Sequence, residues 1–163
     1  MNARYCVRCG ARLEAKEIDQ RQRLFCPRCG HVHYEQLKVG AGILIEREGC
    51  LLLLQRAHEP FLGCWNVPAG YSEADEHPAQ TAVREAREET GLEVEVTRLE
   101  DIYFFDGDPR GNGLLILYRC RVIGGALSGS TEGVNPTYFP RDRIPEPLSG
   151  GGHDQAIRAW QKN

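Results

Sequence analysis

Short apolar runs of strand length recur between residues 39 and 122, and glycine, proline or charged residues separate them. Runs of this kind are typical of strands that are buried on both faces. Leu92 to Val96 differs, because apolar and acidic residues alternate there, as they do in a strand with one face toward solvent. The pattern predicts strands over residues 39–45, 50–55, 63–70, 92–96, 99–105 and 113–122.

A helical period appears between Pro78 and Thr90. Small side chains recur at steps of three and four, which predicts close packing on a sheet; they are Ala79, Ala82, Val83, Ala86 and Thr90. Pro78 suits the first helical position, and Gly91 suits the left-handed residue past a helix end. His77 stands at the N-cap, where Ser or Asp caps more strongly, so we expect packing to support this helix start. A second helix is predicted over residues 153–161.

Two Cys-x-x-Cys pairs lie in the first 30 residues, Cys6 with Cys9 and Cys26 with Cys29, and a glycine follows each pair. Four thiolates with this spacing are typical of a tetrahedral structural zinc site, and glycine permits the tight turn around the ion. The residues between the pairs are too few for a core, so we expect this zinc ribbon to fold with its metal, which contributes about 10–16 kcal/mol in small zinc-dependent peptides. Two disulfides or a redox pair are the alternative. His31 or His33 is the alternative to one cysteine ligand.

The length of 163 residues suffices for one ordinary domain and a small appendage, which we expect at residues 38–163 and 1–37. No apolar run approaches the roughly 18 residues of a membrane span, so the sequence predicts no signal peptide, no membrane anchor and a cytoplasmic location. The net charge of −3 is uneven: residues 1–38 carry eight Lys and Arg against four Asp and Glu, and the remainder carries twelve against nineteen. The basic first part suits an anionic ligand or nucleic acid. A solubilising surface explains it equally well.

The stretch from Gly70 to Leu92 carries a dense group of acids, with Glu85, Glu88 and Glu89 on one stripe of the predicted helix. Each pair of like charges three or four residues apart costs a few tenths of a kcal/mol on an isolated helix. A hard cation bound by the carboxylates would remove that repulsion, so the stripe suits a metal site. A solvated acidic helix face is the alternative, but the spacing argues against it. The motif comprises Gly70, Glu76, Arg84, Glu85, Ala86, Glu88, Glu89, Gly91 and Leu92, and it resembles the Nudix box.

The resemblance covers residue 39 to the C-terminus and implies an α/β/α sandwich with a mixed sheet, preceded by the zinc ribbon. It implies a pyrophosphohydrolase that uses Mg²⁺ or Mn²⁺ on a nucleoside diphosphate linked to another moiety. Glu88 and Glu89 would hold the ion with the carbonyl oxygen of Gly70, and Glu85 would act as general base or further ligand. Arg84 would orient Glu85 by a charge-assisted hydrogen bond. The remaining box residues are structural: Glu76, Gly91 and Leu92.

One acid of the family pattern is absent. Nudix proteins often place a glutamate about four residues before the aromatic of a Trp/Tyr-Phe pair, and counting back from Phe139 gives Asn135. Glu132 is the only acid of the preceding glycine-rich connection, so it is the candidate for that role toward the metal. The turn-rich segment 106–113 is expected to be a solvated loop. The alternative is that its Asp106, Asp108 and Arg110 line the mouth of the substrate site.

The substrate must be selected outside the box. A ribbon before the box also occurs in NADH pyrophosphatases, but their Ser-Gln-Pro-Trp signature is absent here. A closer resemblance is to small ribbon-bearing Nudix hydrolases of ADP-ribose or FAD, which release a nucleoside monophosphate. The alternatives are sanitation of oxidised nucleoside triphosphates and a non-enzymatic regulator that binds nucleic acid through the basic ribbon. Because Nudix domains often dimerise, the resemblance also favours a homodimer.

Overall fold

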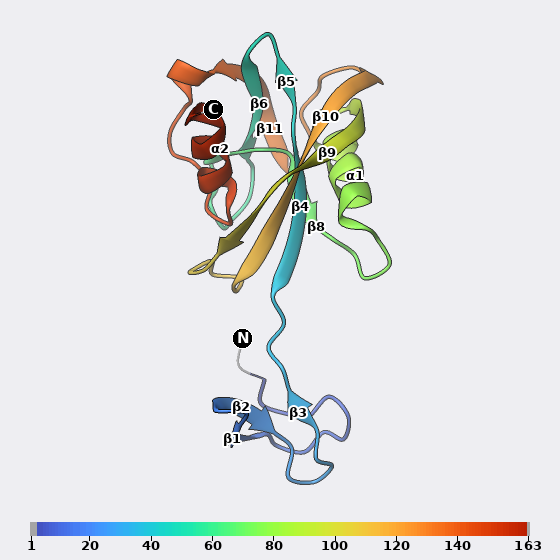
Figure 1. Cartoon of the computed structure of the whole chain (residues 1–163), viewed down its shortest axis with the longest axis vertical. Helices are drawn as coiled ribbons and strands as arrows, with labels where there is room; N and C mark the ends of the chain where they lie inside the picture. Colours follow the sequence, from blue (N-terminus) through green and yellow to red (C-terminus); the bar gives the residue numbers. More distant parts are fainter. Residues whose placement is uncertain (1–2, 163) are drawn as a thin grey trace. The chain divides into compact units, whose positions relative to one another are not determined.

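The computed structural model describes residues 3–162, which form two compact units, one ending at Leu37 and the other beginning at Lys38 (Figure 1). Over these residues, the first unit has one sheet and one buried cluster, and the second unit has two of each. None of the helices formed by residues 3–162 combines the length and apolar character needed to cross a membrane.

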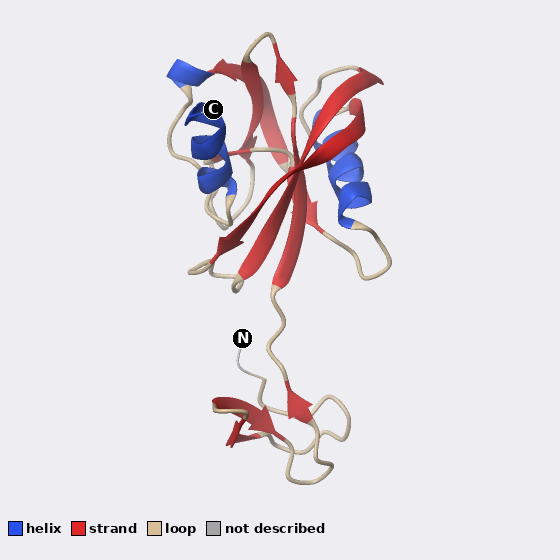
Figure 2. Cartoon of the chain, viewed as in Figure 1, coloured by secondary structure: helices blue, strands red, loops and turns tan. Residues whose placement is uncertain are grey.

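The first unit is built on a small antiparallel sheet in the order β1-β2-β3 (Figure 2). The strands are β1 (Glu14–Ile18), β2 (Arg21–Phe25) and β3 (Val32–His33). Within the described residues, its buried cluster consists of Cys6, Leu13 and Cys26. A core this small cannot offset the entropy of ordering the chain, which agrees with a fold that depends on metal.

The second unit contains two sheets. The first has the order β8-β4-β10-β9 and is mixed, because β4 runs parallel to β10 whereas the other pairs are antiparallel. The second has the order β11-β6-β5, with β7 also paired to β6. The strands are β4 (Lys38–Leu44), β5 (Glu46–Arg47), β6 (Cys50–Arg56), β7 (Trp65–Asn66), β8 (Ala69–Tyr71), β9 (Leu92–Phe105), β10 (Gly113–Gly125) and β11 (Gly133–Pro140).

Two helices cover opposite sides of this unit, α1 (Pro78–Thr90) and α2 (His153–Lys162), and a short 3₁₀ helix, η1, spans Arg141–Arg143 (Figure 1). Successive side chains of a strand point to opposite faces, so each central strand contributes to two clusters. Ile43 packs with Ala82 and Ala86 of α1, whereas its neighbour Leu44 packs with the cluster of α2. The predicted α/β/α sandwich is therefore confirmed.

The predicted bounds of α1 are also confirmed, but the expectation of a weak start is wrong. The His77 imidazole accepts a hydrogen bond from the backbone N–H of Ala79 at 3.2 Å, and the side chain of Gln80 accepts one from the N–H of His77 at 3.0 Å. This is a reciprocal capping box in which an imidazole nitrogen replaces the usual hydroxyl or carboxylate. At the other end Gly91 has φ 69°, as a left-handed cap requires.

The two strands predicted over residues 92–96 and 99–105 form one strand, β9. The alternation of apolar and polar residues is interrupted within β9. The strand nevertheless stays paired with β10, because the register of the pairing shifts at several points, for example between Leu117 and Tyr118. For the same reason β10 extends beyond its predicted end, to Gly125.

Candidate active site

Helix α1 presents its carboxylates to β8. Glu85 and Glu89 lie one turn apart and are 9% and 7% exposed. Glu89 accepts a hydrogen bond from the backbone N–H of Ala69 at 3.0 Å. A Cβ atom at Gly70 would lie 2.0 Å from a carboxylate oxygen of Glu85, so the position must be glycine for Glu85 to stay where it is. The side chain of Glu88 is more open, at 59% exposed.

Arg84 connects the acids of the box. Its guanidinium donates to both carboxylate oxygens of Glu76, at 3.0 and 2.9 Å, and to Glu85 at 2.6 Å. It also reaches Glu88 at 3.1 Å and the carbonyl oxygen of Tyr71 at 3.3 Å. The bonds from Arg84 and Thr81 lower the pKa of Glu76 to about 2. Glu76 thus ties the loop before α1 to the helix, and Arg84 fixes the direction of Glu85.

The buried acids repel one another. Burial raises the pKa of the Glu89 carboxyl to about 8, and the charges of Glu85 and Glu132 add to the rise. Burial also raises the pKa of Glu85, against the opposing effect of Arg84. An oxygen-rich group with excess negative charge fits a hard divalent cation such as Mg²⁺ or Mn²⁺. Gly70, Glu85, Glu88 and Glu89 are the residues that would hold the ion.

Glu132 faces these acids. A cavity of about 240 Å³ is lined by Glu132, Ser130 and Thr131 on one side and by Arg84 and the three box carboxylates on the other. The hydroxyl of Ser130 accepts hydrogen bonds from the backbone N–H groups of Glu132, at 3.1 Å, and Gly133, at 2.9 Å. Asn135 lines neither this cavity nor the adjoining larger one, and its side chain instead donates to Gln55 at 3.0 Å.

A second cavity of about 370 Å³ adjoins the carboxylates. Glu85, Glu89, Glu132 and Gly70 line one part of it. The sequence did not single out the other lining groups, apart from Arg110: Arg56, His58, Tyr71, Phe105, Arg110 and His153. No spacing signal joins them, since they come from β6 and the loop after it, β8, β9, the loop before β10 and the start of α2.

The segment 106–113 contains a loop that is solvated only in part: Asp106, Gly107, Pro109 and Asn112 are exposed, as expected, whereas Asp108 is buried. The side chain of Asp108 is 1% exposed and receives two bonds from the guanidinium of Arg110, from Nε at 2.9 Å and from Nη2 at 2.8 Å. These bonds lower the pKa of Asp108. Arg110 lines the larger cavity, as the alternative expectation held, whereas Asp106 and Asp108 line neither cavity. Turn-forming composition predicts the loop, but it does not reveal that Asp108 is buried against Arg110.

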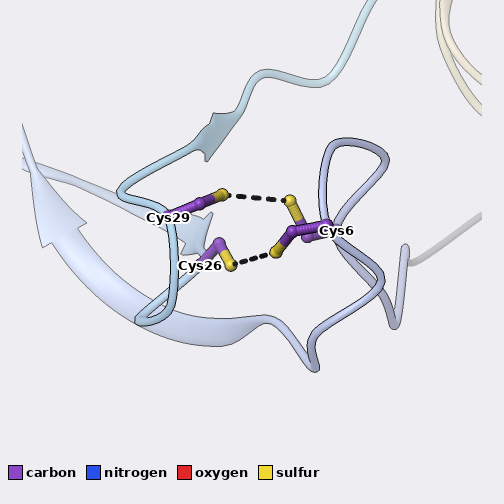
Figure 3. Close-up of side chains that lie close together, drawn as sticks. Cys6, Cys26 and Cys29 are labelled. Carbon is purple, nitrogen blue, oxygen red and sulfur yellow. Dashed lines mark hydrogen bonds between the residues drawn. The ribbon is translucent and has the colours of Figure 1, made fainter.

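In the first unit the four cysteines converge (Figure 3). Their sulfur atoms lie within 4.8 Å of one another, with 3.6 Å between Cys6 and Cys29 and 3.5 Å between Cys9 and Cys26. A tetrahedral zinc site with bonds of about 2.3 Å separates its sulfurs by about 3.8 Å. The two separations exceed the roughly 2.05 Å of a disulfide bond, so the set fits structural zinc rather than two disulfides. Within residues 3–162 only these four donors gather so tightly; the box carboxylates do not.

The chain resembles known proteins over both units. Residues 36–160 match the NUDIX domain family, and residues 4–35 match the zinc-ribbon family described as Nudix N-terminal. The ADP-ribose pyrophosphatase of Methanocaldococcus jannaschii is 36% identical over 120 residues, 73% of this chain and 70% of that protein. The NAD-capped RNA hydrolase NudC of Pseudomonas aeruginosa is 32% identical over 143 residues, 87% of this chain but 49% of that protein. The crystal structure of a NUDIX hydrolase from Nitrosomonas europaea superposes with a TM-score of 0.83 at 28% identity, covering 98% of this chain and 92% of that one.

Proposed function

We propose that this chain, which belongs to the Nudix family of pyrophosphohydrolases and carries the family's zinc ribbon, hydrolyses ADP-ribose or FAD and releases AMP. One observation carries the proposal: the buried carboxylates of Glu85 and Glu89 line a cavity of about 370 Å³ whose wall also includes aromatic and basic side chains. A cavity of this size suits a small nucleotide derivative. The similarity to an ADP-ribose pyrophosphatase over most of both chains supports the choice of substrate.

In this reaction the oxygen of a water molecule bonds to one phosphorus atom, and the bond from that phosphorus to the bridging oxygen breaks. Bound Mg²⁺ or Mn²⁺ would neutralise phosphate charge and make the water more acidic. Glu85 would take the proton of the water; the bond from Arg84 that holds its carboxylate and the burial that raises its pKa support this role. Glu88 and Glu89 would hold the ion, and Glu132 would approach it from the opposite wall.

A substrate panel tests the proposal. ADP-ribose, FAD, NADH and dGTP are each incubated with the purified full chain and Mg²⁺ or Mn²⁺, and the products are separated by chromatography. We expect AMP from ADP-ribose or FAD at a kcat/KM at least tenfold above that for dGTP. A preference for dGTP would replace the proposal with sanitation of nucleoside triphosphates. Salt-dependent binding of nucleic acid without any hydrolysis would favour the regulator instead.

Hydrolysis of the NAD cap of RNA is the second candidate, because the similarity to NudC extends over 87% of this chain and thus reaches into both the ribbon and the catalytic unit. The chain spans about half the length of that protein. An NAD-capped RNA oligonucleotide and free NADH should then both be cleaved, with the RNA preferred. Cleavage of ADP-ribose alone would exclude this candidate. A cytoplasmic location, where thiolates stay reduced, suits either substrate and is part of the proposal.

A further inference from the structure

The basic part of the 370 Å³ cavity holds two guanidinium groups, Arg56 and Arg110. Arg110 pairs with Asp108, whereas no carboxylate within residues 3–162 forms an ion pair with Arg56. The Nε atom of Arg56 donates to the carbonyl oxygen of Pro60 at 2.9 Å. Burial lowers the pKa of Arg56, and the charge of Arg110 lowers it further, whereas the charges of Glu89, Asp108 and Glu132 oppose the shift. Arg56 is thus a half-buried cation without a carboxylate in direct contact, and a bound anion would supply that contact.

The ion pair between Arg110 and Asp108 is held in place from several sides. The backbone N–H of Arg110 also donates to Asp108, at 2.8 Å. Gly151 has φ 72°, and a Cβ atom there would lie 3.4 Å from an oxygen of Asp108 and 3.6 Å from Nη2 of Arg110. Two loops therefore pack around the pair. A buried ion pair contributes little net stability, so its retention beside a cavity points to a rigidly presented guanidinium.

His153 adds an uncharged polar group. It is 8% exposed, lines the same cavity and begins helix α2. Its Nδ1 atom is itself buried and has no hydrogen-bond partner among the described residues. Burial lowers its pKa to about 3, and the charges of Arg56 and Arg110 contribute to the shift. The imidazole is therefore neutral at physiological pH. It can donate a hydrogen bond without adding a third positive charge to the group.

We propose that Arg56, Arg110 and His153 form a phosphate subsite that works without metal. Of the two phosphates of the substrate, it binds the one that lies away from the carboxylates. This inference rests on the proposed function, since a diphosphate brings two phosphates into one cavity. The acidic part of the cavity then binds the phosphate under attack together with the divalent ion, and the basic part binds the other phosphate of the diphosphate. The subsite selects substrates with a diphosphate over monophosphate esters.

Binding of inorganic pyrophosphate to the zinc-loaded full chain, measured by calorimetry without added Mg²⁺, tests the subsite apart from catalysis. Arg110→Gln leaves Asp108 as a buried unpaired carboxylate, so the double variant Asp108→Asn/Arg110→Gln is measured beside it. Arg121→Gln is the matched control, because it removes the same charge from a β10 side chain that is 69% exposed and lies outside the cavity. We expect Kd to rise about 10- to 100-fold in the first two variants, the range for charge-assisted hydrogen bonds, and to stay unchanged in the control.

The ring resonances of His153, identified by their loss in His153→Gln, give a second readout. They should shift saturably with pyrophosphate but not with adenosine, which has no phosphate. A response to adenosine instead, or an unchanged pyrophosphate Kd in the folded double variant, overturns the subsite. If the wild type binds pyrophosphate through Arg110 but cleaves neither ADP-ribose nor FAD, the proposed function fails and the subsite stands. If it cleaves them and the double variant keeps the wild-type KM and pyrophosphate Kd, the subsite fails and the function stands.

Discussion

Replacement of Gly70 by alanine should separate catalysis from folding. The added methyl carbon would lie 2.0 Å from one carboxylate oxygen of Glu85 and 2.7 Å from the other. Carbon and oxygen need about 3.3 Å or more, so the carboxylate must move by roughly 1.3 Å. That movement breaks its 2.6 Å contact with Arg84 and takes it away from the water that it should deprotonate.

The expected loss in kcat/KM is about 100-fold, the usual effect of a 1 Å misplacement in an active site. Stability should change by no more than about 2 kcal/mol. Gly70 has no left-handed φ, so alanine is compatible with the backbone, and the clash falls on the end of a flexible side chain. Steady-state hydrolysis of ADP-ribose and thermal unfolding are measured on the same preparation.

Gly124→Ala is the matched control. Its Cβ atom would lie 2.8 Å from a carboxylate oxygen of Glu93, which is again a glutamate beside a strand glycine, but outside both cavities. It should keep wild-type activity. A folded Gly70→Ala protein with full activity would refute the placement of Glu85, and equal losses in the two variants would show that any strand methyl disturbs the enzyme.

The remaining predictions concern the acids and the zinc. Glu85→Gln and Glu88→Gln should each lower kcat by at least about 100-fold at unchanged melting temperature, and near-normal turnover in either would remove that residue from the mechanism. The raised pKa of Glu89, about 8 against 4.5, means that the folded protein keeps a proton that the unfolded chain has released. Without added Mg²⁺, stability should therefore fall by up to a few kcal/mol as pH rises from about 4.5 to 8, and Glu89→Gln should flatten the fall in denaturant titrations between pH 6 and 8.5. Metal analysis should find one zinc per chain. Cys26→Ser should lose the zinc together with the protection of the backbone amides of residues 3–37 against hydrogen exchange. A zinc-free wild type that keeps this protection would contradict a metal-dependent ribbon.

The sequence was informative where periodicity or fixed spacing carries the signal. The bounds of α1 follow from Pro78 and Gly91, and the four cysteines converge as their spacing predicts. Propensity underrates the N-cap because it describes an average residue, whereas the imidazole of His77 has a nitrogen at the right place to accept from Ala79. The basic end of the cavity could not be predicted, because its residues meet only through the tertiary fold.

The position of Glu132 follows from strand pairing rather than from a flexible loop. Gly133 is the register partner of Arg56 in the ladder between β11 and β6, and the carbonyl oxygen of Glu132 accepts a hydrogen bond from the N–H of Ala57 at 2.9 Å. Glu132 is therefore fixed beside the end of β6, where the cavity opens.

Residue 135, where the family usually has this acid, does not line the cavities, for a related reason. The ladder is irregular between Val134 and Thr137, and Asn135 lies in that irregularity with φ 52°. An irregularity of this kind redirects a side chain, and the amide of Asn135 turns to Gln55 on the neighbouring strand. Asn135 therefore lines neither cavity, whereas Glu132, which precedes the irregularity, lines both of them. On this ground we propose Glu132, rather than the residue at position 135, as the acid that lies across from Glu85 and Glu89.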